Sequence, residues 1–171
     1  MWKLILVLGL FLQPIMADSS SSSDSSSSDS SGSSEETFIR KPTRICDSPL
    51  AYADEGALPQ PIDTLPYKFK ISSYEYSPDT RISVMIYGGT FKGFFVRAFC
   101  KATKKPIGSW ERSPELLGNN VCKAAMPAIR GERDAVKMNW IAPEQGYGKL
   151  FFKISVAKDS CCYWPDIVIE D

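Results

Sequence analysis

Residues 91–98 read Phe-Lys-Gly-Phe-Phe-Val-Arg-Ala, a turn glycine followed by an alternating strand, and this stretch decides the fold. Successive side chains of a strand point to opposite faces, so every second residue from Phe94 to Ala98 shares one apolar face. No ten-residue stretch of the chain shows a helical period, and turn residues separate the alternating runs. The pattern predicts an all-β fold, an antiparallel immunoglobulin-like β-sandwich with Trp140 in its centre. The other alternating runs are Ile82, Val84 and Ile86; Val136, Met138 and Trp140; and Leu150, Phe152, Ile154 and Val156.

The first 17 residues have the composition of a cleaved signal peptide. Lys3 precedes an apolar run from Leu4 to Leu12, and small Ala17 stands at a suitable cleavage site. A run of about nine apolar residues cannot span a hydrocarbon core, which needs about 20. No later segment is long enough either. We therefore expect a secreted, extracellular protein without a membrane span, cleaved after Ala17.

Residues 18–36 form a short acidic segment. Of residues 19–34, 13 are Ser, two are Asp and one is Gly. This composition offers almost no apolar surface to offset chain entropy, so the segment is expected to be disordered. One interpretation is a plain flexible spacer. The other is a phosphorylated or mineral-facing tail, because Ser33 and Ser34 precede two glutamates in an S-x-E pattern and dense oxygen ligands suit Ca²⁺.

Charge and histidine content exclude several classes of function. From Thr37 onward the chain has 19 Lys and Arg against 15 Asp and Glu, a surplus too small to indicate nucleic-acid binding. There is no histidine, which removes Ser-His-Asp and Cys-His catalysis and His-ligated zinc or haem. No nucleophile–base pair supports an enzyme. We expect a binding protein without a cofactor.

The chain contains five cysteines, and in a secreted protein these indicate disulfides first. Because the count is odd, one thiol is free or bonds another molecule, which would give a disulfide-linked dimer. A metal site made of four cysteines competes with this interpretation, but no C-x-x-C spacing supports it and no metal is expected. The cysteines are Cys46, Cys100, Cys122, Cys161 and Cys162.

Seven short motifs follow one another in an order that resembles the reeler (reelin N-terminal) domain family. The resemblance covers about residues 44–170 and implies one domain over residues 37–171. Each motif alone is weak, whereas the ordered series is specific. Asp79 departs from the family's pattern, because it replaces a turn glycine. The motifs are Pro66-Tyr67, Tyr76-Ser77-Pro78-Asp79, Phe91-Lys92-Gly93-Phe94, Gly108-Ser109-Trp110, Cys122, Trp140-Ile141-Ala142-Pro143 and Tyr163-Trp164.

The resemblance also implies a disulfide. The family commonly links a cysteine at the start of the domain to one in its middle, and these positions are Cys46 and Cys122 here. The other three cysteines match no family pair. Adjacent cysteines rarely bond each other without strain, so we expect Cys100 to bond either Cys161 or Cys162.

Basic residues cluster along and after the stretch that decides the fold. Those that alternate with core positions should face solvent, and together they suggest an anion-binding face for microbial surface polymers or acidic extracellular glycans. The alternative is a solvated strand edge on which lysines oppose aggregation. The residues are Lys92, Arg97, Lys101, Lys104 and Lys105.

Single reeler domains behind a signal peptide resemble invertebrate defence proteins that bind microbial surfaces. The chain has no room for a DOMON or cytochrome domain, so the resemblance implies no reductase activity. We therefore expect an antimicrobial or recognition protein of innate immunity. The alternative is a structural component of an extracellular or biomineralised matrix, such as a shell or skeleton, whose Ser/Asp tail binds calcium mineral.

Overall fold

The computed structural model describes Cys46 and residues 57–171. The predicted signal peptide (residues 1–17) and the acidic segment (residues 18–36), which includes Ser33 and Ser34, lie outside the described residues. Within the described part, no helix has the length and apolar character needed to cross a membrane.

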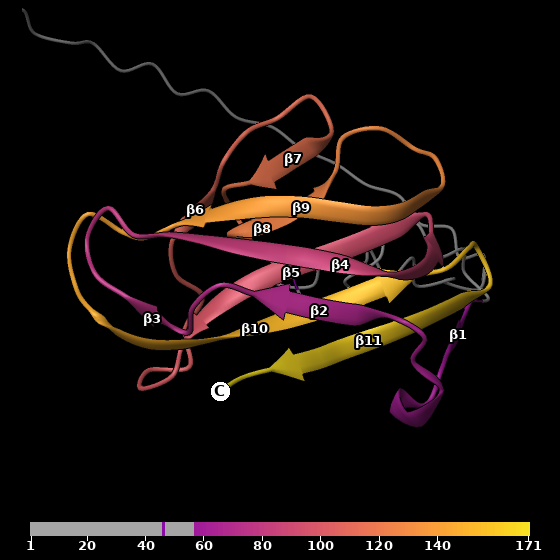
Figure 1. Ribbon diagram of the computed structural model, residues 1–171, viewed down its shortest axis with the longest axis horizontal. Helices are drawn as coiled ribbons and strands as arrows, with labels where there is room; N and C mark the ends of the chain where they lie inside the picture. The colour runs from indigo at the N-terminus through magenta and orange to yellow at the C-terminus, as the bar shows by residue number, and fades with distance from the viewer. Residues whose placement is uncertain (1–45, 47–56) are drawn as a thin grey trace, which may run out of the picture. The chain divides into compact units, whose positions relative to one another are not determined.

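The strands of this part form two sheets, and Figure 1 shows the longer strands of both running roughly along the long axis of the view. The larger sheet has the order β1-β11-β10-β5-β8-β7, and β3 pairs with the start of β10. The smaller sheet has the order β2-β4-β9-β6. Paired strands are antiparallel except β1 and β11, which are parallel. The strands of the larger sheet are β1 (Leu58–Pro59), β3 (Glu75–Tyr76), β5 (Gly93–Cys100), β7 (Leu116–Asn119), β8 (Ala124–Pro127), β10 (Gly148–Ala157) and β11 (Cys162–Ile169). Those of the smaller sheet are β2 (Lys68–Ile71), β4 (Arg81–Phe91), β6 (Ser109–Trp110) and β9 (Arg133–Ile141), and a 3₁₀ turn, η1 (Ile62–Thr64), lies between β1 and β2.

One hydrophobic core holds the two sheets together, and it contains all four alternating runs that the sequence indicates. None of their side chains is more than 6% exposed. Alternation places these residues on one face of each strand, and the two apolar faces bury one another. The predicted all-β sandwich is therefore confirmed, whereas its immunoglobulin-like character stays a prediction.

Trp140 lies at the centre of this core with no exposed surface. Its indole Nε1 donates a hydrogen bond of 3.1 Å to the carbonyl oxygen of Ile107. Gly108 has φ +70, and a Cβ atom there would lie 2.3 Å from the Trp140 ring. Only glycine can occupy this position beside the indole, which explains the glycine of the Gly108-Ser109-Trp110 motif.

The turn between β3 and β4 accepts Asp79 in place of the family's glycine. Asp79 has φ 65, in the left-handed region where aspartate is better tolerated than most side chains. Two hydrogen bonds close the turn: the Ser77 amide donates to Thr80 Oγ1 at 3.0 Å, and the Thr80 amide donates to the Ser77 carbonyl oxygen at 3.1 Å. The substitution therefore keeps the turn.

The structure contains the Cys46–Cys122 disulfide that the resemblance implies, with Cα atoms 5.3 Å apart. The expected bond from Cys100 to Cys161 or Cys162 is wrong, because all three are free thiols. Cys100 pairs with Leu150 near the start of β10, whereas Tyr163 pairs with Ala157 at its end. Seven residues of strand correspond to about 23 Å, far beyond the reach of a disulfide.

Candidate anion-binding face

The five basic residues that cluster in the sequence do not form one group in the structure. Lys92 lies in the turn before β5, and Lys101, Lys104 and Lys105 follow β5 at its other end. The eight residues of the strand separate them by about 26 Å. Lys92 Nζ forms an ion pair with Glu132 at 3.3 Å, and Lys101 Nζ forms one with Glu170 at 3.2 Å. Lys92 is thus separated from the other predicted site residues, and both lysines already have acidic partners.

Arg97 has a basic neighbour, Lys153, that is distant from it in the sequence. β5 and β10 are antiparallel, and their register places Arg97 directly opposite Lys153 and Phe99 directly opposite Phe151. The two phenylalanine rings stack with their centroids 5.4 Å apart. All four side chains lie on the face of the larger sheet that points away from the smaller one, because the alternate residues of both strands belong to the core.

Three cations surround this pair of rings. The Arg97 guanidinium carbon lies 5.0 Å from the centroid of Phe99, and Lys153 Nζ lies 5.6 Å from the same centroid. Lys104 Nζ lies 5.0 Å from the centroid of Phe151. These are cation–π distances, and they hold the charged ends over the aromatic surface. We call this group the cation–aromatic patch; it consists of Arg97, Phe99, Lys104, Phe151 and Lys153.

The positive charge of the cation–aromatic patch is not neutralised within the described residues. None of the ion pairs formed there includes Arg97, Lys104 or Lys153. Like charges placed directly opposite on neighbouring strands destabilise a sheet. Arg97 and Lys153 occupy such a pair of positions, so an anion bound between them would relieve their repulsion.

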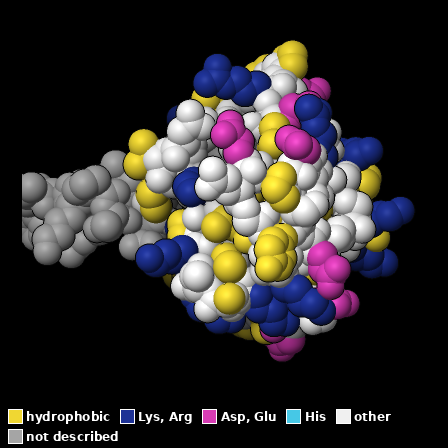
Figure 2. Space-filling model, turned by 90° about the vertical axis from the view of Figure 1, so that its left-hand side faces the viewer, with side chains coloured by type: hydrophobic (Ala, Val, Ile, Leu, Met, Phe, Trp, Pro, Cys, Tyr) yellow, Lys and Arg dark blue, Asp and Glu magenta, His cyan; other side chains and the backbone are white. Residues whose placement is uncertain are grey.

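The chemistry of the cation–aromatic patch fits oxyanions. A guanidinium can donate two parallel hydrogen bonds to a carboxylate, sulfate or phosphate group, and a lysine ammonium adds a mobile point charge. The turn that carries Lys104 and Lys105 follows β5 at the end of the sandwich seen in Figure 2, where basic side chains gather low in the view with a few acidic ones beside them. Further cations are therefore available next to the patch for a polymeric ligand.

Two hollows of the surface are weaker candidates. One, of about 510 Å³, is lined by Tyr67 and Trp164 among others. Their polar atoms are already used: Tyr67 Oη donates to the carbonyl oxygen of Thr90 at 3.0 Å, and Trp164 Nε1 donates to Thr64 Oγ1 at 3.1 Å. Burial raises the pKa of Tyr67 to about 12, so its hydroxyl stays neutral. The other hollow, of about 160 Å³, lies on the smaller sheet between exposed Lys70 and Lys137 and has no aromatic floor.

One feature of the sequence indicates that Phe151 and its neighbour Lys153 lie on a covered or ligand-binding outer face. Phe94-Phe95 and Phe151-Phe152 place aromatic residues on both faces of their strands, which departs from simple alternation. A strand that is apolar on its outer face needs a second cover or a ligand. The pairing of Arg97 with Lys153 depends on the register of β5 and β10, which alternation alone leaves open.

Comparisons with known proteins agree with the fold. Two crystal structures of F-spondin are similar to this chain: the Reelin-N domain, at 18% identity over 75% of this chain and 96% of that one with a TM-score of 0.51, and the human reeler domain, at 17% identity over 63% and 89% with a TM-score of 0.49. At this identity the likeness to the Reelin-N domain, whose TM-score is above 0.5, supports the fold alone. No curated protein matches. The sequence pattern of the reeler domain matches residues 45–170, and the chain therefore belongs to the reeler domain family.

Proposed function

We propose that this protein is a secreted recognition protein of innate immunity, which binds acidic polymers of microbial surfaces through the cation–aromatic patch. One observation carries the proposal: Arg97 and Lys153 lie directly opposite each other and have no acidic partner among the described residues. The class of ligand follows from the hydrogen-bond donors of these two side chains, a guanidinium and an ammonium group. Polymers that repeat a phosphate or carboxylate group would occupy several such cations at once.

The family supports the general character of this function. Reeler domains occur in extracellular proteins, and they are adhesion- or matrix-type domains rather than enzymes. Adhesion to a charged polymer needs exposed cations on a rigid frame. β5 and β10 supply that frame, because both are continuous strands inside the larger sheet.

Binding to purified bacterial cell walls tests the proposal with a matched pair of double variants. Arg97→Gln with Lys153→Gln removes two charges from the cation–aromatic patch. Lys70→Gln with Lys137→Gln removes two charges from the outer face of the smaller sheet. Two charge-assisted contacts are worth about 3 kcal/mol together, so the first variant should lose about 150-fold in affinity. The second should stay within about twofold. Equal losses in both variants would show that only net charge matters.

The acidic segment favours a second candidate, a matrix protein that binds calcium mineral. Its support is compositional: residues 18–36 hold Ser, Asp and Glu and no basic residue. Deleting these residues should abolish binding to calcium carbonate if the tail carries the function. If the cation–aromatic patch carries it, the same deletion leaves cell-wall binding unchanged.

A further inference from the structure

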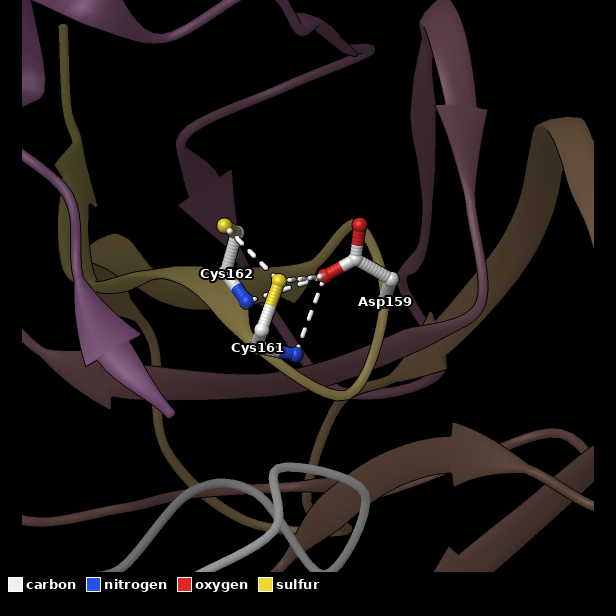
Figure 3. Close-up of side chains that lie close together, drawn as sticks. All are labelled: Asp159, Cys161 and Cys162. Atoms are coloured by element: carbon white, nitrogen blue, oxygen red, sulfur yellow. Dashed lines mark hydrogen bonds between the residues drawn. The ribbon is translucent and has the colours of Figure 1, made fainter. Parts of the chain in front are cut away.

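Two neighbouring thiols lie against a carboxylate in the turn between β10 and β11. Figure 3 shows Cys161, Cys162 and Asp159 facing one another, and the two Sγ atoms are 3.3 Å apart. Asp159 Oδ1 accepts three hydrogen bonds, from Cys161 Sγ at 3.1 Å and from the amides of Cys161 and Cys162 at 3.0 and 2.9 Å. The turn therefore holds both sulfur atoms close together on the same side.

These two thiols are the pair of free cysteines that geometry allows to join within the described residues. Cys46 and Cys122 already bond each other. Cys100 is at the far end of β5, about 23 Å away along β10. Cys161 is exposed and Cys162 is half-buried, so a small reagent can reach the pair.

We propose that Cys161 and Cys162 form a reversible vicinal disulfide in the presence of a small disulfide oxidant such as oxidised glutathione. One thiolate attacks the small disulfide and releases one small thiol, which leaves a mixed disulfide on the protein. The neighbouring sulfur then displaces the second small thiol. Two electrons pass to the oxidant, and the protons of the two protein thiols end on the two released thiols. This inference goes beyond the proposed binding function and does not depend on its ligand.

The bond would also change the edge of the larger sheet. The peptide that joins the two cysteines is held on both sides: the Leu58 amide donates to the Cys161 carbonyl oxygen at 2.8 Å, and the Cys162 amide donates to Asp159. The ring of a vicinal disulfide contains this peptide and forces it to reorient. Leu58 belongs to β1, so closing the ring loosens the pairing of β1 with β11. A strained ring is easily reduced, which makes the turn responsive to the ratio of thiol to disulfide outside the protein.

Asp159 controls the rate of this reaction. Its carboxylate accepts the Cys161 thiol hydrogen and raises the pKa of that thiol to about 11, which keeps the sulfur protonated at neutral pH. Since the thiolate is the attacking species, Asp159→Asn should speed closure about tenfold or more at pH 7.5. The amide oxygen of Asn can still accept the two backbone hydrogen bonds, so the variant changes the charge and leaves the turn in place.

Tryptic mapping of the full-length protein after incubation in glutathione buffers tests the proposal. Residues 159–171 contain Cys161 and Cys162 and no Lys or Arg, and residues 98–101 contain Cys100. We expect the 159–171 peptide to lose two hydrogen atoms and to resist alkylation until it is reduced, while the 98–101 peptide is alkylated. Oxidation should also speed hydrogen exchange of the Leu58 amide.

Two results would overturn the proposal. One is a cross-link between the 98–101 and 159–171 peptides. The other is a 159–171 peptide that keeps both thiols, or carries only glutathione adducts, in fully oxidising buffer. Cys161→Ser is the control, because it must form the glutathione adduct on Cys162 without ring closure.

Discussion

β5 and β10 present two faces that are both rich in phenylalanine, but the two faces are covered differently. On the inner face, Phe94 and Phe152 pack against the smaller sheet and are at most 1% exposed. On the outer face, Phe99 and Phe151 are at most 8% exposed, and cations without acidic partners in the described part of the chain lie over their rings. Burial between the two sheets alone explains why the inner face carries apolar side chains. Among the described residues, the cations of the outer face have no acidic partner, which folding does not require, and this difference is the basis of the proposed binding function.

Truncation of Phe152 should have the largest effect on stability. Phe152 is fully buried, and its ring centroid lies 6.3 Å from that of Trp110. Phe152→Ala leaves a cavity between the sheets and should lower the free energy of unfolding by about 4 kcal/mol. Urea denaturation measures this loss. If the alanine variant does not fold, Phe152→Leu should still show a loss of about 1 kcal/mol, and the absence of any loss would contradict the assignment of this face to the core.

Removal of the disulfide should have the next largest effect. Cys46 and Cys122 pack with Phe95 on the outer face and close a loop with a sequence separation of 76 residues. Replacing both by Ala should lower the free energy of unfolding by about 3 kcal/mol, because the unfolded chain gains conformational freedom. Thermal unfolding with and without reductant provides the check. The double variant should be insensitive to reductant, and a wild-type protein equally insensitive would refute a structural role for this bond.

Phe151 provides the matched comparison with Phe152, since the two are adjacent and point to opposite faces. Phe151→Ala removes one ring of the stacked pair but opens no cavity between the sheets. We expect a loss of about 1.5 kcal/mol, less than half of that for Phe152→Ala. The same urea titration compares the two variants. Equal losses would mean that the outer ring is as tightly enclosed as the inner one.

Neutralising the opposed cations should have the smallest effect on stability. Arg97→Gln with Lys153→Gln should change the free energy of unfolding by less than about 0.5 kcal/mol, and in the stabilising direction at low salt, because it removes repulsion between directly opposed charges. Salt should stabilise the wild type slightly more than the variant. A clear destabilisation would indicate that the two side chains contribute to the fold and weaken the case for a ligand.

The sequence alone was sufficient to predict which residues of β5 and β10 lie on the inner face. It was not sufficient to predict the cation–aromatic patch on the outer face. Period-two alternation identifies Phe94 and Phe152 because burial between two sheets requires only apolar residues at every second position. The cation–aromatic patch depends on which residue of β10 lies opposite Arg97, and a register is set by the whole sheet. The unknown register also explains why the predicted disulfide from Cys100 to Cys161 or Cys162 was wrong. The pairing of β5 with β10 fixes the distance between Cys100 and Cys161. Lys92 and Arg97 are only five residues apart in the sequence, but the extended strand β5 carries them away from each other, so they do not belong to one cluster.

Backbone-amide NMR during titration with short poly(glycerol phosphate) tests the account most directly, because it reports on every face of the domain at once. The account predicts saturable shifts at Arg97, Phe99 and Lys153, which fade as salt screens the charges. It predicts only minor shifts at Lys70 and Lys137 on the smaller sheet. Shifts centred on the smaller sheet, or spread evenly over all lysines without saturation, would contradict the assignment of binding to the outer face of β5 and β10.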